Sequence, residues 1–135
     1  MKPRPCTPYF NSPETATVVD RASYVQAVCR NLLNRFVPAD DEGLVYWLGE
    51  LRTGRTTPCA VIGNSIYAAI QADSVDWLTI WHKVQVAEYV TQRFAASDRE
   101  WQVSDLNLAR QALIGVTDDP ASVVTGRARV DGLLP

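Results

Sequence analysis

The apolar residues of this 135-residue chain recur every three or four positions over most of its length. This spacing puts them on one side of an α-helix, whereas a half-buried strand needs an apolar residue at every second position. No stretch keeps such an alternation between turn signals. The sequence therefore predicts an all-α fold, a compact bundle of about five to six helices that forms a single domain over residues 20–135.

The most regular helical period runs from Asp73 or Ser74 to about Phe94 and predicts the longest helix. Its expected buried stripe consists of Trp77 or Leu78, Trp81, Val84, Ala87 or Glu88, Val90 and Phe94. A similar stripe predicts the first helix, which we expect Pro38 to end. That stripe consists of Val25, Val28, Cys29, Leu32, Leu33 and Phe36.

Start and stop signals mark the other helices. Thr57-Pro58 and Asp119-Pro120 each place a side chain that can cap a helix before a proline at the first helical position. Gly54 is placed to end the second helix. Ser104 can cap the fifth helix. The sixth helix is expected to begin after Pro120 and to reach about residue 126 or beyond.

The first nineteen residues differ in composition from the rest of the chain. Four prolines fall within the first thirteen positions, and they prevent a helix because each fixes φ and lacks the backbone N–H. We therefore expect residues 1–19 to form an extended, Pro-rich N-terminal arm. The adjacent aromatic residues Tyr9 and Phe10 can pack on the parent domain or anchor in a neighbouring subunit, so both are interface candidates.

Charge and hydropathy argue against two classes of partner. The chain has 13 basic and 15 acidic residues, and its basic residues form no stripe, so we expect no binding to nucleic acid. Its apolar runs span only a few residues, whereas a membrane-spanning helix needs about 20, so no membrane insertion is expected. The N-terminus also lacks the apolar region of a cleaved signal peptide.

The three cysteines and the single histidine are the side chains of this chain with the most reactive chemistry. Cys6, Cys29 and Cys59 show no CxxC spacing, and their odd number argues against a disulfide framework. We expect Cys29 and Cys59 to be small core residues. His82 can in principle pair with Cys59 as a base and a nucleophile, but no third orienting residue is apparent. We therefore expect no catalytic residue, and a partly exposed His82 beside a buried Trp81.

Two acidic clusters, residues 40–42 and 118–119, precede expected helices. A calcium loop needs more oxygen ligands at alternating positions than either cluster supplies, so charge at a helix N-terminus is the better interpretation. The seven glycines form no phosphate-binding motif. The sequence accordingly predicts no metal site and no cofactor.

Trp101 is the aromatic residue that fits none of the apolar stripes. Most of the other tryptophans and tyrosines are expected in the core, because aromatic side chains bury large areas. Trp101 lies instead among Arg99, Glu100 and Gln102. It can be a core residue, a protein-interface anchor or a platform for a sugar ring, and it is our third interface candidate.

Several short patterns follow one another in a fixed order between Tyr24 and the C-terminus. They are Leu32-Leu33-Asn34-Arg35, Asp40-x-x-Gly43-Leu44-x-Tyr46-Trp47, Leu51-x-x-Gly54, Val61 and Ser65, Lys83-Val84-x-Val86-Ala87-x-Tyr89, and Val116-Thr117-x-Asp119-Pro120-Ala121-Ser122-Val123. In order and spacing they resemble the domain of unknown function numbered 4214, a helical module of RTX-type exoproteins, surface-layer proteins and phage tail proteins. The family's Arg-x-Pro-Asp is longer here, at residues 35–40, and His82 stands where asparagine is common.

The resemblance implies a non-enzymatic structural or adhesive module of an extracellular assembly. A small copy without a signal peptide suits a phage virion protein of the tail, neck or baseplate. Its expected partners are other structural proteins of that assembly, or itself, and its expected location is the virion. The alternative is a surface-layer or exoprotein-type module that binds a cell-surface glycan, outside the cell or at its surface.

Overall fold

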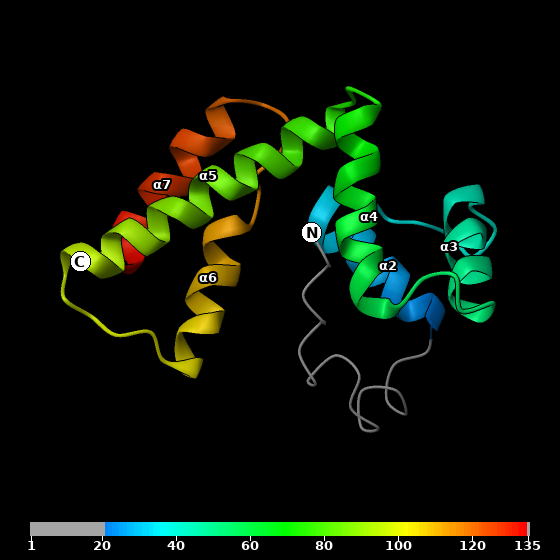
Figure 1. Cartoon of the computed structure of the whole chain (residues 1–135). Helices are drawn as coiled ribbons and strands as arrows, with labels where there is room; N and C mark the ends of the chain where they lie inside the picture. The colour runs from blue at the N-terminus through cyan, green and yellow to red at the C-terminus, as the bar shows by residue number, and fades with distance from the viewer. Residues whose placement is uncertain (1–20, 135) are drawn as a thin grey trace. The chain divides into compact units, whose positions relative to one another are not determined.

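The computed structural model describes residues 21–134, and this part of the chain is all-α, as predicted (Figure 1). It contains six α-helices, one short 3₁₀ helix and no strand. The elements are α2 (Arg21–Leu33), α3 (Glu42–Arg52), α4 (Pro58–Gln71), α5 (Val75–Ala96), η2 (Val103–Asp105), α6 (Leu106–Leu113) and α7 (Ala121–Leu133). The arm expected over residues 1–19 lies outside the described residues.

By its internal contacts the chain divides into two compact units, Met1–Ala72 and Asp73–Pro135. The first unit contains α2, α3 and α4, and the second contains α5, η2, α6 and α7. Each unit has an apolar core of its own. The single domain expected over residues 20–135 stays a prediction.

In the first unit, α2 packs against both α3 and α4. The buried residues of this core are Val25, Val37, Leu44, Leu51 and Val61. The predicted start signal of α4 is present, since the Thr57 Oγ1 accepts the Ala60 N–H at 3.2 Å. The predicted stop signal of α3 is also present, since Gly54 has a φ of +72°. A glycine takes this left-handed conformation without a steric penalty.

The end of α2 differs from the prediction. The helix stops at Leu33, because Asn34 takes a φ of +57° and the Arg35 N–H then donates to the Cys29 carbonyl at 3.2 Å. Phe36 consequently lies in the following loop with 85% of its surface exposed. Its predicted place on the buried stripe was wrong, because the helical period ends three residues before it.

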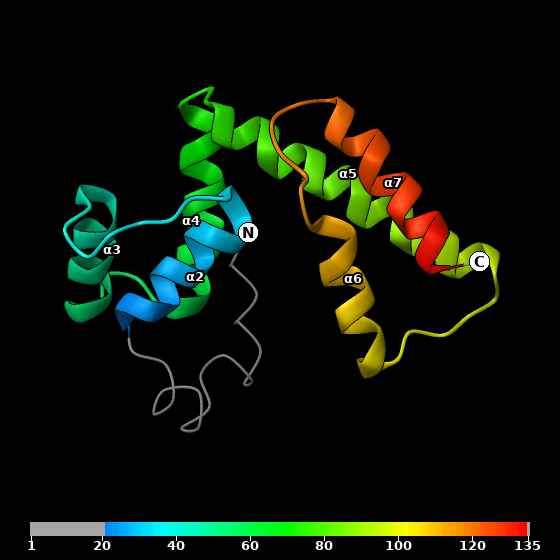
Figure 2. The same ribbon diagram turned by 180° about the vertical axis from the view of Figure 1, so that it is seen from behind.

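In the second unit, α7 runs alongside α5, and α6 packs against both (Figures 1 and 2). The buried core residues are Val86, Val90, Phe94, Ala112, Val116, Val123, Val130 and Leu134. At the end of the unit, the Arg93 guanidinium donates to the Asp131 carboxylate and, at 2.6 Å, to the Leu134 carbonyl. The Tyr89 hydroxyl donates to the same carboxylate at 2.8 Å, so several polar contacts join the C-terminal turns of α5 and α7.

The buried face of α5 differs from the predicted stripe. Its buried residues are Thr79, Ile80, His82, Lys83, Val86, Val90 and Phe94. Trp81 is 46% exposed, whereas His82 is 6% exposed, so the predicted burial of these two residues was reversed. The first half of α5 carries apolar residues on the face opposite the core, and a period taken from the sequence cannot tell which face meets α6 and α7.

Candidate functional site

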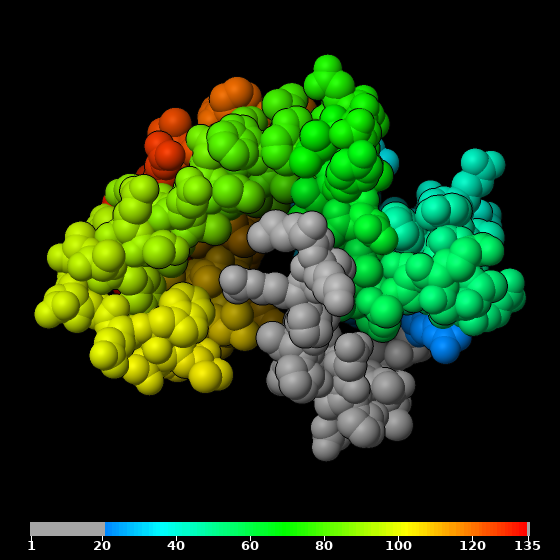
Figure 3. All heavy atoms as spheres, viewed as in Figure 1, coloured from blue at the N-terminus to red at the C-terminus, as the bar shows by residue number. Residues whose placement is uncertain are grey.

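An apolar patch lies on the exposed side of the first half of α5. It consists of Trp77, Leu78, Trp81 and Val84, and we call it the α5 patch. Leu78, Trp81 and Val84 are 45%, 46% and 39% exposed. The rings of Trp77 and Trp81, one helical turn apart, have their centroids 6.0 Å from each other. Figure 3 shows the atoms of α5 as a continuous band on the surface of the second unit.

Trp101 lies in the loop between α5 and η2, with 51% of its surface exposed. One side of its ring contacts the buried Phe94, at 5.4 Å between centroids. The Arg99 guanidinium lies 5.0 Å from the centroid of the same Phe94 ring. Trp101 is therefore a half-exposed ring supported from beneath by the core. The other two interface candidates, Tyr9 and Phe10, lie outside the described residues.

A buried carboxylate holds the Trp101 loop in place. Asp105 is 4% exposed, and its Oδ1 accepts from Arg99 at 2.5 Å. Its Oδ2 accepts the backbone N–H of Gln102 at 2.8 Å. These bonds fix the residues on both sides of Trp101, which lowers the conformational entropy that a ligand would have to remove on binding.

His82 has a structural contact that sequence reasoning missed. Its Nδ1 lies 2.8 Å from the Thr117 carbonyl oxygen, 35 residues away. Since a carbonyl can only accept, Nδ1 carries the hydrogen and donates it. His82 therefore connects α5 to the segment that precedes α7. His82 precedes the buried Val86 by four residues and Val90 by eight, so all three lie on one face of the helix. This spacing was the sequence signal for the burial of His82.

Lys83 is also buried on α5, with 8% of its surface exposed. Removal from water lowers the pKa of its amine below the usual value of 10.5. Burying this charged amine lowers the free energy of unfolding unless polar contacts of the amine compensate for the lost hydration.

Of the two described cysteines, Cys59 is disulfide-bonded, and Cys29 packs against the core of the first unit. This corrects the expectation that Cys59 is an unmodified core residue. A disulfide sulfur is not a thiolate, so Cys59 in this state cannot serve as the nucleophile of a Cys–His pair.

The acidic clusters act at helix starts. The Asp41 Oδ1 accepts the Leu44 N–H at 3.0 Å, and the Asp119 Oδ1 accepts the Ala121 N–H at 2.9 Å. Within residues 21–134, no three His, Cys, Asp or Glu side chains come together as a group that could hold a metal ion. None of the helices in this part of the chain is both long enough and apolar enough to span a membrane.

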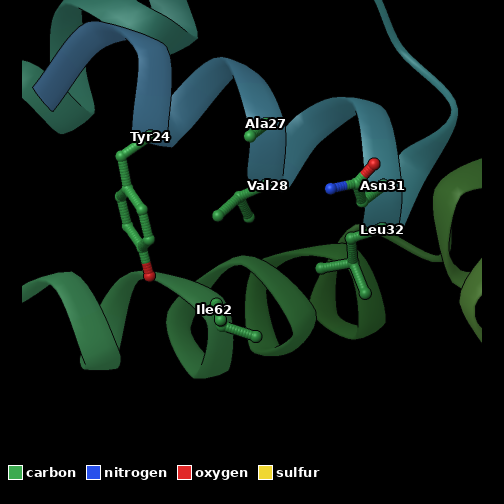
Figure 4. A pocket seen from close by; sticks show the side chains of 6 residues that line it. All are labelled: Tyr24, Ala27, Val28, Asn31, Leu32 and Ile62. Atoms are coloured by element: carbon green, nitrogen blue, oxygen red, sulfur yellow. The ribbon is translucent and has the colours of Figure 1, made fainter. Parts of the chain in front are cut away.

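A pocket of about 330 Å³ lies between α2 and α4 in the first unit (Figure 4). Its lining residues are Tyr24, Ala27, Val28, Asn31, Leu32 and Ile62. The Tyr24 hydroxyl reaches the start of α4 and donates to the Pro58 carbonyl. Partial burial raises the pKa of Tyr24. Two of the lining residues, Val28 and Leu32, belong to the apolar stripe predicted for the first helix. The stripe did not predict that the groove beside them is open.

No family model, no curated protein and no solved structure matches this chain. The resemblance to the domain of unknown function numbered 4214 therefore stays a prediction.

Proposed function

We propose that this chain is a non-enzymatic structural module of an extracellular assembly, specifically a virion protein of a phage tail, neck or baseplate. In this role it binds other structural proteins of the assembly, or further copies of itself. The observation that carries the proposal is the α5 patch. The resemblance of the chain to modules found in phage tail and surface-layer proteins supports the choice of assembly.

The composition of the α5 patch suits a protein interface. Two tryptophan rings on successive turns give a broad apolar centre, and tryptophan is among the residues that contribute most to binding energy at interfaces. Asp76, Gln85 and Glu88 lie on the same helix around this centre. An apolar centre with a polar rim is the usual anatomy of a protein–protein contact.

Other exposed apolar residues of the described surface lie in pairs or singly. Val45 and Tyr46 are on α3, Tyr67 and Ile70 are on α4, and Val124 is a single residue on α7. Single exposed apolar residues are normal on soluble domains, whereas a contiguous group marks an interaction site. The α5 patch has four apolar residues, two of them tryptophans, and we assign this larger group to assembly.

The variant Trp81→Ser is expected to weaken self-association at least tenfold. Loss of an interface tryptophan commonly costs more than 2 kcal/mol, and about 1.4 kcal/mol already corresponds to a factor of ten. Light scattering behind a sizing column, over a concentration series, measures the mass. We expect the wild-type mass to rise above the 15.0 kDa of one chain towards a defined multiple.

Val124→Ser is the matched control, because Val124 is 71% exposed on α7 and lies outside the α5 patch. It is expected to associate like the wild type. Equal masses for wild type and Trp81→Ser at every concentration would show that the α5 patch does not mediate self-association. The same pair of variants would then be tested against candidate structural proteins of the particle.

An alternative function is that of a surface-layer or exoprotein-type module that binds a cell-surface polysaccharide. The observation that favours it is Trp101, because a half-exposed ring on a rigid support can stack on the apolar face of a sugar. Arg99, Glu100 and Gln102 beside it supply groups that can form hydrogen bonds with hydroxyls.

If this alternative holds, Trp101→Ala is expected to weaken binding to purified cell-envelope polysaccharide about tenfold, because the stacking platform is lost. Isothermal titration calorimetry measures the affinity. Trp101→Phe keeps an aromatic face and is expected to retain most of the binding. An affinity that Trp101→Ala leaves unchanged would remove Trp101 from any glycan site.

A further inference from the structure

We propose that the α5 patch of one copy docks in the groove between α2 and α4 of a second copy, so that copies of this chain join head to tail. This inference rests on the proposed function, because it names the partner of the α5 patch. The second surface, which we call the α2–α4 groove, is lined by Tyr24, Ala27, Val28, Asn31, Leu32 and Ile62.

The α2–α4 groove has the shape and the chemistry that the apolar face of a helix needs. Val28 and Leu32 line it from α2, and Ile62 lines it from α4 (Figure 4). Ile66 and Ile70 follow at intervals of four residues, so they continue the apolar row along the same side of α4. The pocket volume of about 330 Å³ has room for a large aromatic side chain. Grooves of this kind bind helices through apolar residues that are one turn apart.

The anchors of the α5 patch match the groove in spacing. Its two tryptophans, Trp77 and Trp81, are four residues apart. Val28 and Leu32 have the same separation, which is about 6 Å along a helix. When α5 runs antiparallel to α2 and Trp81 lies at Val28, the other tryptophan therefore lies at Leu32. Trp81 then fills the pocket, which Ile62 borders from α4.

The same register brings opposite charges together. Glu88 follows Trp81 by seven residues, and Arg21 precedes the groove residue Val28 by the same number. Seven residues are about two turns, so each charge lies on the same side of its helix as the apolar row. Both residues are exposed, and neither belongs to an ion pair of the described residues. Since α2 and α4 contain no acidic residue, the groove attracts the Glu88 carboxylate.

Charge also argues against a symmetric contact between two α5 patches. The α5 patch extends from Trp77 to Val84, and the exposed residues Asp73 and Glu88 lie four positions beyond its two ends. An antiparallel contact centred on the patch would therefore bring Glu88 of each copy towards Asp73 of the other. A parallel contact would bring the two Glu88 side chains together. Like charges in these places oppose association, whereas the α2–α4 groove offers a cation.

A contact between two different surfaces has a consequence for the size of the assembly. Each copy carries one α5 patch, in its second unit, and one α2–α4 groove, in its first unit. A complex of two copies that share one such contact still has a patch and a groove without a partner. Further copies bind there until a ring closes. A ring has the defined multiple of the chain mass that we expect for the wild type.

The first experiment mixes two variants that are each defective in one surface. Trp81→Ser removes the central residue of the α5 patch and keeps the groove. Ala27→Glu places a charge in the α2–α4 groove and keeps the patch. Each variant alone is expected to associate at least tenfold more weakly than the wild type. Their equimolar mixture is expected to form a 1:1 complex of two chains, because one intact patch meets one intact groove. Light scattering behind a sizing column measures the mass.

The outcomes separate this inference from the proposed function. If Ala27→Glu associates like the wild type while Trp81→Ser does not, the α2–α4 groove is not the partner, and the proposed function stands. A wild type that stays monomeric at every concentration would also overturn docking in a second copy. The proposed function would then depend on binding to other structural proteins. Full association of Trp81→Ser would overturn the role of the α5 patch in self-association, and this inference with it.

The second experiment tests the register and is independent of the folding of the groove variant. At low ionic strength, Arg21→Glu and Glu88→Arg are each expected to weaken association about threefold, because each brings like charges together. The two substitutions in one chain exchange the charges and are expected to restore wild-type association. Arg30→Glu is the matched control and is expected to have no effect, because Arg30 is exposed on the side of α2 opposite Val28. A double variant that associates no better than the single variants would overturn the proposed docking.

Far-UV circular dichroism of every variant checks that the helices are intact.

Discussion

The variant Phe94→Ala is expected to lower the free energy of unfolding by about 3–5 kcal/mol, the usual cost of removing a buried phenylalanine side chain. Phe94 is 6% exposed and belongs to the core of the second unit, together with Val90 and Leu134. The substitution leaves a cavity, because the surrounding helices relax only partially into the vacated space. Urea unfolding followed by circular dichroism measures the loss.

Phe94→Ala also removes the support beneath the Trp101 ring, which lies 5.4 Å from the Phe94 ring between centroids. We therefore expect the fluorescence of Trp101 to shift towards that of a solvated indole. Phe94→Leu is the control, since it keeps most of the apolar volume and is expected to cost much less. A loss below about 1 kcal/mol for Phe94→Ala would mean that this core is not packed as described.

The variant Gly126→Ala is expected to lower the free energy of unfolding by about 1–3 kcal/mol, although alanine favours helices more than glycine does. A Cβ at this position of α7 would lie 2.9 Å from the Val86 Cγ2 and 3.3 Å from the Val116 Cγ2. Val86 is β-branched and lies in a helix, so its side chain has one strongly preferred rotamer and cannot turn away. The close contact of α7 with α5 therefore requires a glycine.

Gly132→Ala provides the matched control, because it makes the same change in the same helix, where a Cβ meets no described atom within 4 Å. It is expected to leave stability unchanged or to raise it by up to about 1 kcal/mol. The measurement is again the urea midpoint at constant slope. Equal effects of the two substitutions would contradict the close packing of α7 on α5.

The sequence predicted the helices well because their boundaries depend on neighbouring residues. Thr57-Pro58 starts α4, and Gly54 follows the end of α3. The prediction that Ser104 caps the fifth helix was wrong, because Ser104 lies inside η2 and Asp105 is at the N-cap of α6. Caps and left-handed glycines act within one turn, so they are visible in the order of residues. The predicted end of α2, at Pro38, was too late. Asn34 adopts a left-handed conformation, which ends the helix at Leu33, and the sequence pattern did not predict this.

The candidate sites were predicted less well. Trp101 stood out because it fits no stripe, and the structure places it half-exposed on Phe94. The α5 patch was missed, because a helical period alone cannot distinguish an exposed apolar stripe from a buried one, and its tryptophans were assigned to the core. The pocket between α2 and α4 was also missed, since an open groove between two helices depends on how they pack and not on either helix by itself.

What the sequence determined by itself is the all-α class of the described residues and most of the limits of their helices. These follow from local periodicity and capping, which act over a few residues. The tertiary structure alone decided which face of α5 is buried and that His82 donates to a carbonyl 35 residues away. It also decided that position 126 needs a glycine, because Val86 packs closely against it. Each of these depends on contacts between segments distant in the chain, and a helical period is the same whichever of its faces meets a neighbour.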